Sequence, residues 1–248
     1  SLHKRGYRKL QSKAPISETL AAALIMLTPW KKDRILVDPF CGSGTFPIEA
    51  AMMACNIAPG MNRSFLAEDW TNLIPRKHWY NALEEAQDLV HMEESLDLQG
   101  YDIDPEVVKN ARENAAAAGV DHLIHFQQRE VEKLRHPKKY GFIITNPPYG
   151  ERMMDVNAAR KLLRGFGAAA AQSPMKQYII SSDEQFEEFY GMKADKKRKL
   201  YNGMLRCNLY MYYQPPEKRR PFRTAPTGKN RPQGGRPAGK KRQDFRKR

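Results

Sequence analysis

Short apolar runs alternate along the first 213 residues with segments whose apolar residues recur at helical spacing. The apolar runs predict buried strands at 34–40, 96–104, 123–128, 140–145 and 177–181. The segments of helical spacing predict helices at 17–27, 45–57, 105–119 and 184–191, and a closing hairpin is expected at 199–213. Because strands and helices alternate, the sheet is expected to be mostly parallel, with helices on both of its faces.

The residues at the ends of two helical segments support these assignments. Ser17 is a candidate N-cap for the first helix. Asp104 is placed to cap the third helix, with Pro105 at its first position and Gly119 just past its end. Capping residues, proline and glycine at these positions are typical of helix boundaries.

The predicted organisation is one domain at 1–213, followed by a basic tail at 214–248. Residues 58–95, rich in aromatics at first and helical later, are interpreted as an insertion within the domain. The tail contributes +11 of the formal net charge of +14. It holds six prolines, four glycines and almost nothing that could form a core, so it is predicted to be disordered. It is expected to attract nucleic acid, with a merely solubilising tail as the alternative.

Composition excludes several classes of protein. No run of 18 apolar residues is present, so no membrane-spanning helix is expected. The three scattered cysteines suit neither a disulfide framework nor a zinc site, and the six histidines lack metal-ligand spacing. A reducing cytoplasm is therefore expected, without a bound metal. No apolar signal segment accompanies the basic cluster that opens the chain, formed by Lys4, Arg5, Arg8, Lys9 and Lys13.

A glycine-rich turn follows the first predicted strand. Ligands bind beyond the carboxyl ends of the strands in an open parallel sheet. In "DPFCGSGT", residues 38–45, Gly42 and Gly44 permit tight turns and close approach of a ligand. The segment lacks the lysine of a P-loop and the third glycine of a dinucleotide fingerprint. An ordinary strand-turn-helix corner is the alternative.

An acidic residue ends the next strand. Asp102 is placed to accept hydrogen bonds from both hydroxyls of a ribose, whereas Asp104 is explained as a helix cap. The distance along the chain from Gly42 to Asp102 is about three times the usual twenty or so residues. The insertion at 58–95 accounts for the difference.

The segment after the strand at 140–145 carries the most specific chemistry. It reads Asn146-Pro147-Pro148-Tyr149, and neither proline has the N–H needed to continue a strand. The Asn146 side-chain oxygen and the Pro147 carbonyl can each accept one N–H of a base amine, which turns the nitrogen lone pair toward an electrophile. Tyr149 can stack on the base. A simple proline-rich turn would need neither the asparagine nor the tyrosine.

These motifs carry a family resemblance. The glycine-rich turn resembles motif I of class I S-adenosylmethionine-dependent methyltransferases, and Asn-Pro-Pro-Tyr resembles motif IV of amino-methyltransferases. The chain as a whole resembles the bacterial 23S ribosomal RNA guanine-N2 methyltransferases, which carry a THUMP domain and are often labelled N6-adenine-specific DNA methylases. This resemblance covers 2–213 and includes "LHKRGYR" (2–8), "APISETLAAAL" (14–24), "IAPGMNR" (57–63), "NPPYGER" (146–152) and "LYNGMLRCNLY" (200–210).

The resemblance implies a Rossmann-like class I fold, with a seven-stranded sheet and a C-terminal antiparallel hairpin. It implies S-adenosylmethionine as cofactor, methyl transfer to guanine N2 and large-subunit ribosomal RNA as partner. The implied catalytic residues are Asn146, Pro147, Pro148 and Tyr149. The implied cofactor site consists of Asp38, Phe40, Cys41, Gly42, Ser43, Gly44, Thr45, Asp102, Ile103, Glu130 and Asn146.

Some details of the resemblance are less direct. Phe40 and Ile103 are expected to flank the adenine ring. Many relatives have an aspartate that contacts the adenine amino group, and here the nearest acid is Glu130. Residues 2–8 correspond to a junction that follows a THUMP RNA-binding domain, which does not precede them in this sequence.

Two other functions stay open at this point. A DNA adenine-N6 methyltransferase shares the amine chemistry but usually brings a separate target-recognition domain, for which no segment is large enough. A non-catalytic nucleic-acid-binding module on the same fold would not need intact Gly42, Gly44 and Asp102. Glu151 and Arg152 could position an RNA phosphate or form a surface ion pair.

Overall fold

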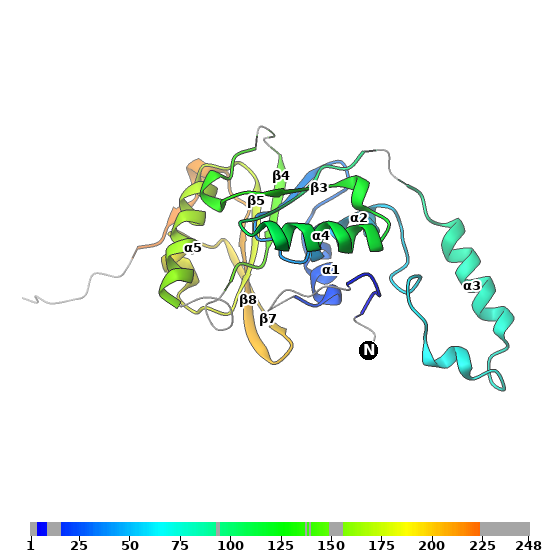
Figure 1. Cartoon of the computed structure of the whole chain (residues 1–248). Coiled ribbons are helices and arrows are strands. Elements are labelled where there is room, and N and C mark those ends of the chain that lie inside the picture. The colour runs from blue at the N-terminus through cyan, green and yellow to red at the C-terminus, as the bar shows by residue number, and fades with distance from the viewer. Residues whose placement is uncertain are drawn as a thin grey trace, which may run out of the picture.

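Seven strands form one sheet at the centre of the computed structural model (Figure 1). The structure describes residues 4–8, 16–92, 95–136, 138, 140–148 and 156–223. The sheet order is β3-β2-β1-β4-β5-β8-β7. Strands β1 to β5 pair in parallel, whereas β8 pairs antiparallel with β5 and with β7, which confirms the predicted fold class. The bounds are β1 (Ile35–Asp38), β2 (Leu98–Asp102), β3 (Ile124–Gln128), β4 (Gly141–Thr145), β5 (Lys176–Ser181), β7 (Lys196–Asn202) and β8 (Leu205–Tyr212).

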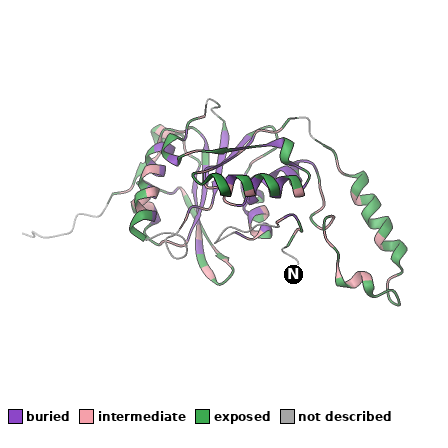
Figure 2. Cartoon of the chain, viewed as in Figure 1, coloured by how far each residue is buried: buried purple, intermediate pink, exposed green. Residues whose placement is uncertain are grey.

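Helices cover both faces of this sheet (Figures 1 and 2). Alternating strand residues divide between two buried clusters, because successive side chains point to opposite faces. Leu36 joins the cluster on one face, and its neighbours Ile35 and Val37 join the cluster on the other. The first face is covered by α1 (Glu18–Met26), α2 (Thr45–Ala54) and α4 (Pro105–Ala117), and the second by α5 (Val156–Ala171) and α6 (Phe186–Tyr190).

The shorter elements lie in the connections. The 3-10 helices are η1 (Leu66–Asp69), η2 (Asp121–Leu123), η3 (Val131–Lys133) and η4 (Pro216–Lys218). A second, two-stranded sheet pairs β6 (Met192–Lys193) with β9 (Arg220–Pro221).

The segment between α2 and β2 carries a helix that stands away from the sheet (Figures 1 and 2). Helix α3 (Arg76–Asp88) has no buried residue. Two hydrogen bonds fix the base of this segment: the Asn56 side chain donates to the Leu89 carbonyl at 3.0 Å, and the His91 N–H donates to the Cys55 carbonyl at 3.1 Å.

Helix α5 is absent from the sequence-based prediction. Four of its six buried residues are alanine or glycine, and its two glycines lower the helix propensity, although Leu163 and Phe166 give the segment an apolar face. Packing explains one of the glycines: a Cβ at Gly167 would lie 2.0 Å from the Tyr190 carbonyl oxygen. The close approach of α5 to α6 therefore requires glycine at this position.

The folded part of the chain extends beyond residue 213, where the sequence suggests that a disordered tail begins. Residues 214–223 include η4 and β9, and Arg219 donates hydrogen bonds to the carbonyls of Ala170, Ala171 and Met175. Its guanidinium satisfies backbone acceptors at the end of α5. Composition alone could not reveal this, because the partners lie more than 40 residues away in the chain. The rest of the predicted tail, 224–248, lies outside the described residues.

Neither a membrane span nor a metal-binding cluster is found among the described residues. Over the ranges given above, no helix is long and apolar enough to cross a membrane. Over the same ranges, no group of three or more His, Cys, Asp and Glu side chains is placed to hold a metal ion.

Candidate functional site

A buried hydrogen bond joins the ends of β1 and β4. The Thr145 hydroxyl donates to Asp38 Oδ1 at 2.6 Å, and the Phe40 N–H donates to the same oxygen at 3.2 Å. Both side chains of the 2.6 Å pair are buried. Strand β1 pairs with β2 on one side and β4 on the other, so this is the point at which the strand order reverses. Ligands bind at such a point in open α/β sheets.

The glycine-rich turn between β1 and α2 adopts the backbone that its glycines predict. Gly42 has φ 52° and Gly44 has φ 81°, a left-handed region that favours glycine. The Gly42 N–H donates to Asp102 Oδ2 at 3.2 Å, and the Cys41 N–H donates to the Tyr101 carbonyl at 2.8 Å. The turn is thereby fixed to the end of β2.

The two acids at the end of β2 have separate tasks. Asp104 caps α4, since its Oδ1 accepts a hydrogen bond from the Glu106 N–H at 2.9 Å. Asp102 is half-buried, and its two oxygens accept from the N–H groups of Gly42 and Asp104. Burial raises the pKa of Asp102, and these two hydrogen bonds oppose the rise. A partly dehydrated carboxylate between two loops suits a role in ligand binding.

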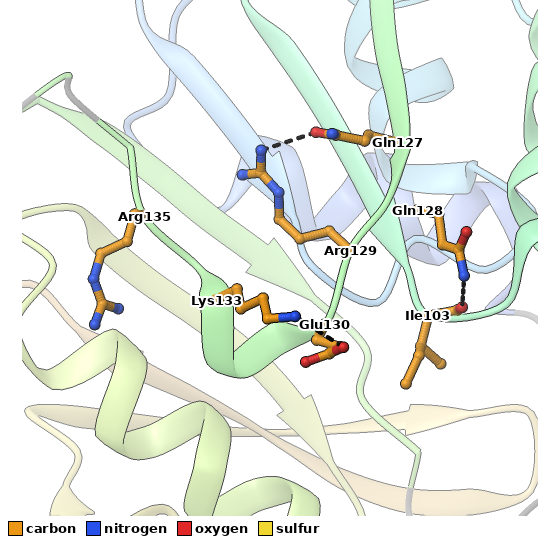
Figure 3. Close-up of a pocket in the computed structure, with 7 residues that line it drawn as sticks. All are labelled: Ile103, Gln127, Gln128, Arg129, Glu130, Lys133 and Arg135. Carbon is orange, nitrogen blue, oxygen red and sulfur yellow. Dashed lines mark hydrogen bonds and ion pairs between the residues drawn. The ribbon is translucent and has the colours of Figure 1, made fainter.

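A cavity of about 450 Å³ opens at the carboxyl end of β3 (Figure 3). Ile103 and Glu130, two of the predicted cofactor residues, both line it. The Gln128 side chain donates to the Ile103 carbonyl at 3.0 Å, which ties the loops after β2 and β3 together. The remaining lining residues are Gln127, Arg129, Lys133 and Arg135. The sequence-based prediction did not include Gln128. The adjacent glutamines Gln127 and Gln128 at the end of β3 could have indicated a ligand-binding position.

Two predicted cofactor residues have other contacts in the structure. Glu130 forms an ion pair with Lys133 at 3.0 Å, and Figure 3 shows the two side chains facing each other. Phe40 is half-buried, and its ring packs edge-on against Phe166 of α5 with centroids 5.2 Å apart. Their expected contacts with the adenine ring therefore stay predictions.

The proposed catalytic segment begins where β4 ends. Asn146 and Pro148 are half-buried and Pro147 is buried. They follow Thr145 directly, so the Asp38 hydrogen bond holds this segment beside the glycine-rich turn. The other predicted residues of this loop, Tyr149, Glu151 and Arg152, lie outside the described residues.

Comparison with known proteins shows the family and the fold of the chain. The chain matches the RMKL-like methyltransferase domain over residues 5–211. This chain belongs to that family. It is 46% identical over 213 residues to "Putative RNA methyltransferase YpsC" of Bacillus subtilis (strain 168), which covers 86% of this chain and 55% of that protein. It is 40% identical over 219 residues to "Ribosomal RNA large subunit methyltransferase K/L" of Shewanella woodyi, covering 86% of this chain and 31% of that protein. The methyltransferase domain thus spans about half of one relative and a third of the other.

Two solved structures resemble the domain closely. "A possible methylase from Clostridium difficile 630" is 50% identical with a TM-score of 0.81, covering 86% of this chain and 56% of that one. "SMU.472, a putative methyltransferase complexed with SAH" is 43% identical with a TM-score of 0.79, covering 86% and 55%. These similarities confirm the class I methyltransferase fold.

S-adenosylmethionine is the cofactor of the methyltransferase domain. The residues present fit it: the cavity lined by Ile103 has room for an adenine ring, and the half-buried Asp102 directly precedes Ile103 in the chain. Asp102 would hold the ribose, and the turn at Gly42 and Gly44 would lie along the methionine part.

The N-terminal segment of the domain contacts the same turn. Arg8 Nη2 donates to Thr45 Oγ1 at 2.7 Å and to the Ile16 carbonyl at 2.8 Å. The Thr45 hydroxyl in turn lies 3.1 Å from that of Ser43, whose carbonyl accepts from the Asn114 side chain at 3.1 Å. Residues before and after the glycine-rich turn in the sequence, Arg8 and Asn114, therefore hold it in place.

A buried network of charged groups anchors this N-terminal segment. Arg5 Nε lies 3.5 Å from Glu49 Oε1, and the Tyr7 hydroxyl donates to the same oxygen at 2.9 Å. Arg8 Nε lies 3.7 Å from Glu18 Oε1. Sequence reasoning treated Arg5 and Arg8 only as part of a basic cluster. Glu49, a single acid inside the apolar helix α2, could have indicated that a buried basic partner exists.

The pH dependence of stability should report on Asp38. Burial raises the pKa of Asp38 from 3.8 to about 7, although hydrogen bonds from Thr145 and Phe40 oppose the rise. The folded state therefore binds the proton more tightly than the unfolded chain. The resulting stability is present below about pH 4 and is lost as the pH rises through about 7, with a loss of up to about 4 kcal/mol.

Asp38→Asn should remove this contribution while keeping an acceptor for Thr145. We expect urea unfolding from pH 5 to pH 8, without cofactor, to show a smaller fall in the free energy of unfolding for the variant than for the wild type. Parallel pH profiles for the two proteins would show that Asp38 does not titrate in this range.

Proposed function

We propose that this chain transfers a methyl group from S-adenosylmethionine to an exocyclic amine of an RNA base, namely guanine N2 in large-subunit ribosomal RNA. The observation that carries the proposal is the placement of Asn146, Pro147 and Pro148 at the end of β4. Here the Thr145–Asp38 hydrogen bond holds them next to the cofactor turn. This adjacency of Asn146 and the glycine-rich turn at the strand-order reversal supports a catalytic role for the one and a cofactor-binding role for the other.

The segment is suited to activating an amine. The lone pair of an exocyclic base amine is delocalised into the ring, so the nitrogen is a poor nucleophile. The Asn146 side-chain oxygen and the Pro147 carbonyl would each accept one N–H and turn the lone pair out of the ring plane. The prolines restrict the backbone, so these acceptors need little reorganisation during the reaction. When bound, the cofactor supplies a methyl group on a positively charged sulfur.

Support for RNA as substrate comes from charge and from relatives. The chain has a formal net charge of +14, which favours a polyanionic partner. The names of two relatives specify RNA and large-subunit ribosomal RNA. A solved structure 47% identical to the chain is described instead as "a predicted N6-adenine-specific DNA methylase" from Listeria monocytogenes. Adenine N6 is therefore the second candidate acceptor.

Nucleoside analysis distinguishes these acceptors. Unmodified large-subunit ribosomal RNA is incubated with the protein and S-adenosylmethionine, digested to nucleosides and examined by mass spectrometry. We expect N2-methylguanosine. N6-methyladenosine as the sole product would contradict the proposed base, and a chain that binds cofactor and RNA without any product would favour a binding module.

Asp102 should determine cofactor affinity. Asp102→Ala removes a half-buried acceptor proposed to bind both ribose hydroxyls, so binding should weaken by roughly 1–3 kcal/mol. Isothermal titration calorimetry with S-adenosylhomocysteine measures the loss. Asp121→Ala, which removes an exposed acid elsewhere on the surface, is the matched control and should bind like the wild type. Equal affinities for all three proteins would exclude the ribose role.

A further inference from the structure

The β7–β8 hairpin overhangs the edge of the sheet at which the catalytic segment lies. Ser181, the last residue of β5, pairs with Asn208, so residues 200–202 of β7 and 205–207 of β8 continue past the end of β5. At about 3.3 Å per residue, this overhang is about 10 Å long. Because β5 is parallel to β4, it projects on the side where Asn146 follows β4. Figure 1 shows the hairpin extending beyond the neighbouring strands.

The outer strand of this hairpin carries a run of cations. Lys196, Lys197, Arg198 and Lys199 are consecutive and all exposed. Lys197 forms an ion pair with Glu187 at 2.9 Å. In the portion of the chain that the structure describes, none of the other three forms an ion pair. Three cations along a sheet edge thus lack a neutralising acid there and are available to a polyanion.

The end of the hairpin exposes an aromatic ring and a methionine side chain. Tyr201 is 55% exposed and Met204 is fully exposed. Tyr201 is the cross-strand partner of Arg206, which is also exposed, and Lys199 Nζ lies 5.4 Å from the centre of the Tyr201 ring. An exposed aromatic ring beside cations is a common platform for single-stranded nucleic acid, since every base can stack on it.

Protection of the edge strand is the competing explanation. Lysines on an edge strand suppress pairing with other chains. That role would not call for an exposed tyrosine and methionine at the end of the hairpin, because apolar groups there promote association. It also gives no reason for the cations to lead toward the catalytic edge.

We propose that the β7–β8 hairpin binds the RNA strand flanking the target base. Lys196, Arg198 and Lys199 contact its phosphates, and Tyr201 stacks on an unpaired base. This inference rests on the proposed RNA methyltransferase function and assigns a substrate-binding surface within the domain itself.

The test compares two charge-matched variants of the full chain. Lys196→Ala/Arg198→Ala/Lys199→Ala removes three hairpin cations. Lys31→Ala/Lys77→Ala/Lys109→Ala removes three exposed lysines away from the hairpin and outside the basic tail. Binding of an unmodified large-subunit ribosomal RNA transcript is measured at several salt concentrations. The hairpin variant should bind at least about tenfold more weakly, with a slope of log affinity against log salt smaller by about 2–3.

The RNA affinities of the hairpin variant and the control variant together decide the proposal. A control that keeps its affinity within about twofold, together with the loss in the hairpin variant, supports the hairpin surface. Equal losses of RNA affinity in the two variants overturn it, because total charge and not the hairpin then determines binding. No loss in either variant also overturns it, because the hairpin cations then do not contribute to binding. Unchanged affinity for S-adenosylhomocysteine shows that each variant is folded.

Tyr201 provides an uncharged second readout. Tyr201→Ala should weaken RNA binding about tenfold, whereas Tyr201→Phe should stay within about twofold because the ring remains. Equal binding by both variants overturns the stacking role. Methyl transfer by the wild type is measured separately. If the hairpin variants bind RNA normally, the proposed methyl transfer is unaffected. If the wild type transfers no methyl group, the RNA-binding measurements still decide whether the hairpin binds RNA.

Discussion

Replacing Asn146 by alanine is expected to lower kcat by about 10²–10³ and to leave cofactor affinity nearly unchanged. The side-chain oxygen is proposed to hold an N–H of the target amine, an interaction needed mainly in the transition state. Asn146 follows β4 at the edge of the sheet and is only half-buried, so its loss should not unfold the domain. Single-turnover methyl transfer at saturating RNA measures the chemical step directly.

Asn146→Asp is the matched variant, because it retains an oxygen acceptor in a side chain of the same size. It should keep more activity than Asn146→Ala. Calorimetry with S-adenosylhomocysteine separates a catalytic loss from a cofactor loss. A kcat for the alanine variant close to that of the wild type would remove Asn146 from the proposed catalytic segment.

Replacing Glu49 by alanine is expected to destabilise the domain by about 3–5 kcal/mol. Glu49 is buried in α2, where it contacts the Arg5 guanidinium and the Tyr7 hydroxyl. Burial raises the pKa of Glu49, and the Arg5 charge lowers it again in part. Removing the carboxylate leaves a largely buried guanidinium and a buried hydroxyl without this partner. Helix propensity cannot explain the loss, since alanine is the best helix former.

Glu49→Gln is the informative control. Glutamine keeps an acceptor for Tyr7 and removes a charge whose burial is itself costly, so the change should be much smaller than for alanine. Urea unfolding of the three proteins in the absence of cofactor gives the differences. Equal stability of the wild type and the alanine variant would show that the N-terminal segment does not need this network.

The sequence predicts the parts of the fold that depend on local patterns. Apolar runs locate the five parallel strands, and the capping role of Asp104 follows from its position before Pro105. The glycine-rich turn is predictable because Gly42 and Gly44 accept a backbone that other residues rarely adopt. These features are fixed by neighbours within a few residues.

Features that depend on residues far apart in the sequence cannot be predicted from local patterns. Arg219 resembles any other tail arginine until the carbonyls at the end of α5 are brought next to it. Arg8 and Thr45 are 37 residues apart, and their hydrogen bond links the N-terminal segment to the glycine-rich turn. Helix α5 is difficult to recognise because four of its six buried residues are alanine or glycine. In each case the tertiary contact, not the local pattern, determines the structure.

The most direct test of the account is transfer of a labelled methyl group from S-adenosylmethionine to nucleic acid by the wild-type chain. Unmodified large-subunit ribosomal RNA and duplex DNA are offered at equal nucleotide concentration, with Asn146→Ala as the inactive reference. The account predicts label in the RNA, little in the DNA, and a loss of about 10²–10³ with the variant. Label in DNA alone, or equal transfer by the wild type and Asn146→Ala, would contradict it.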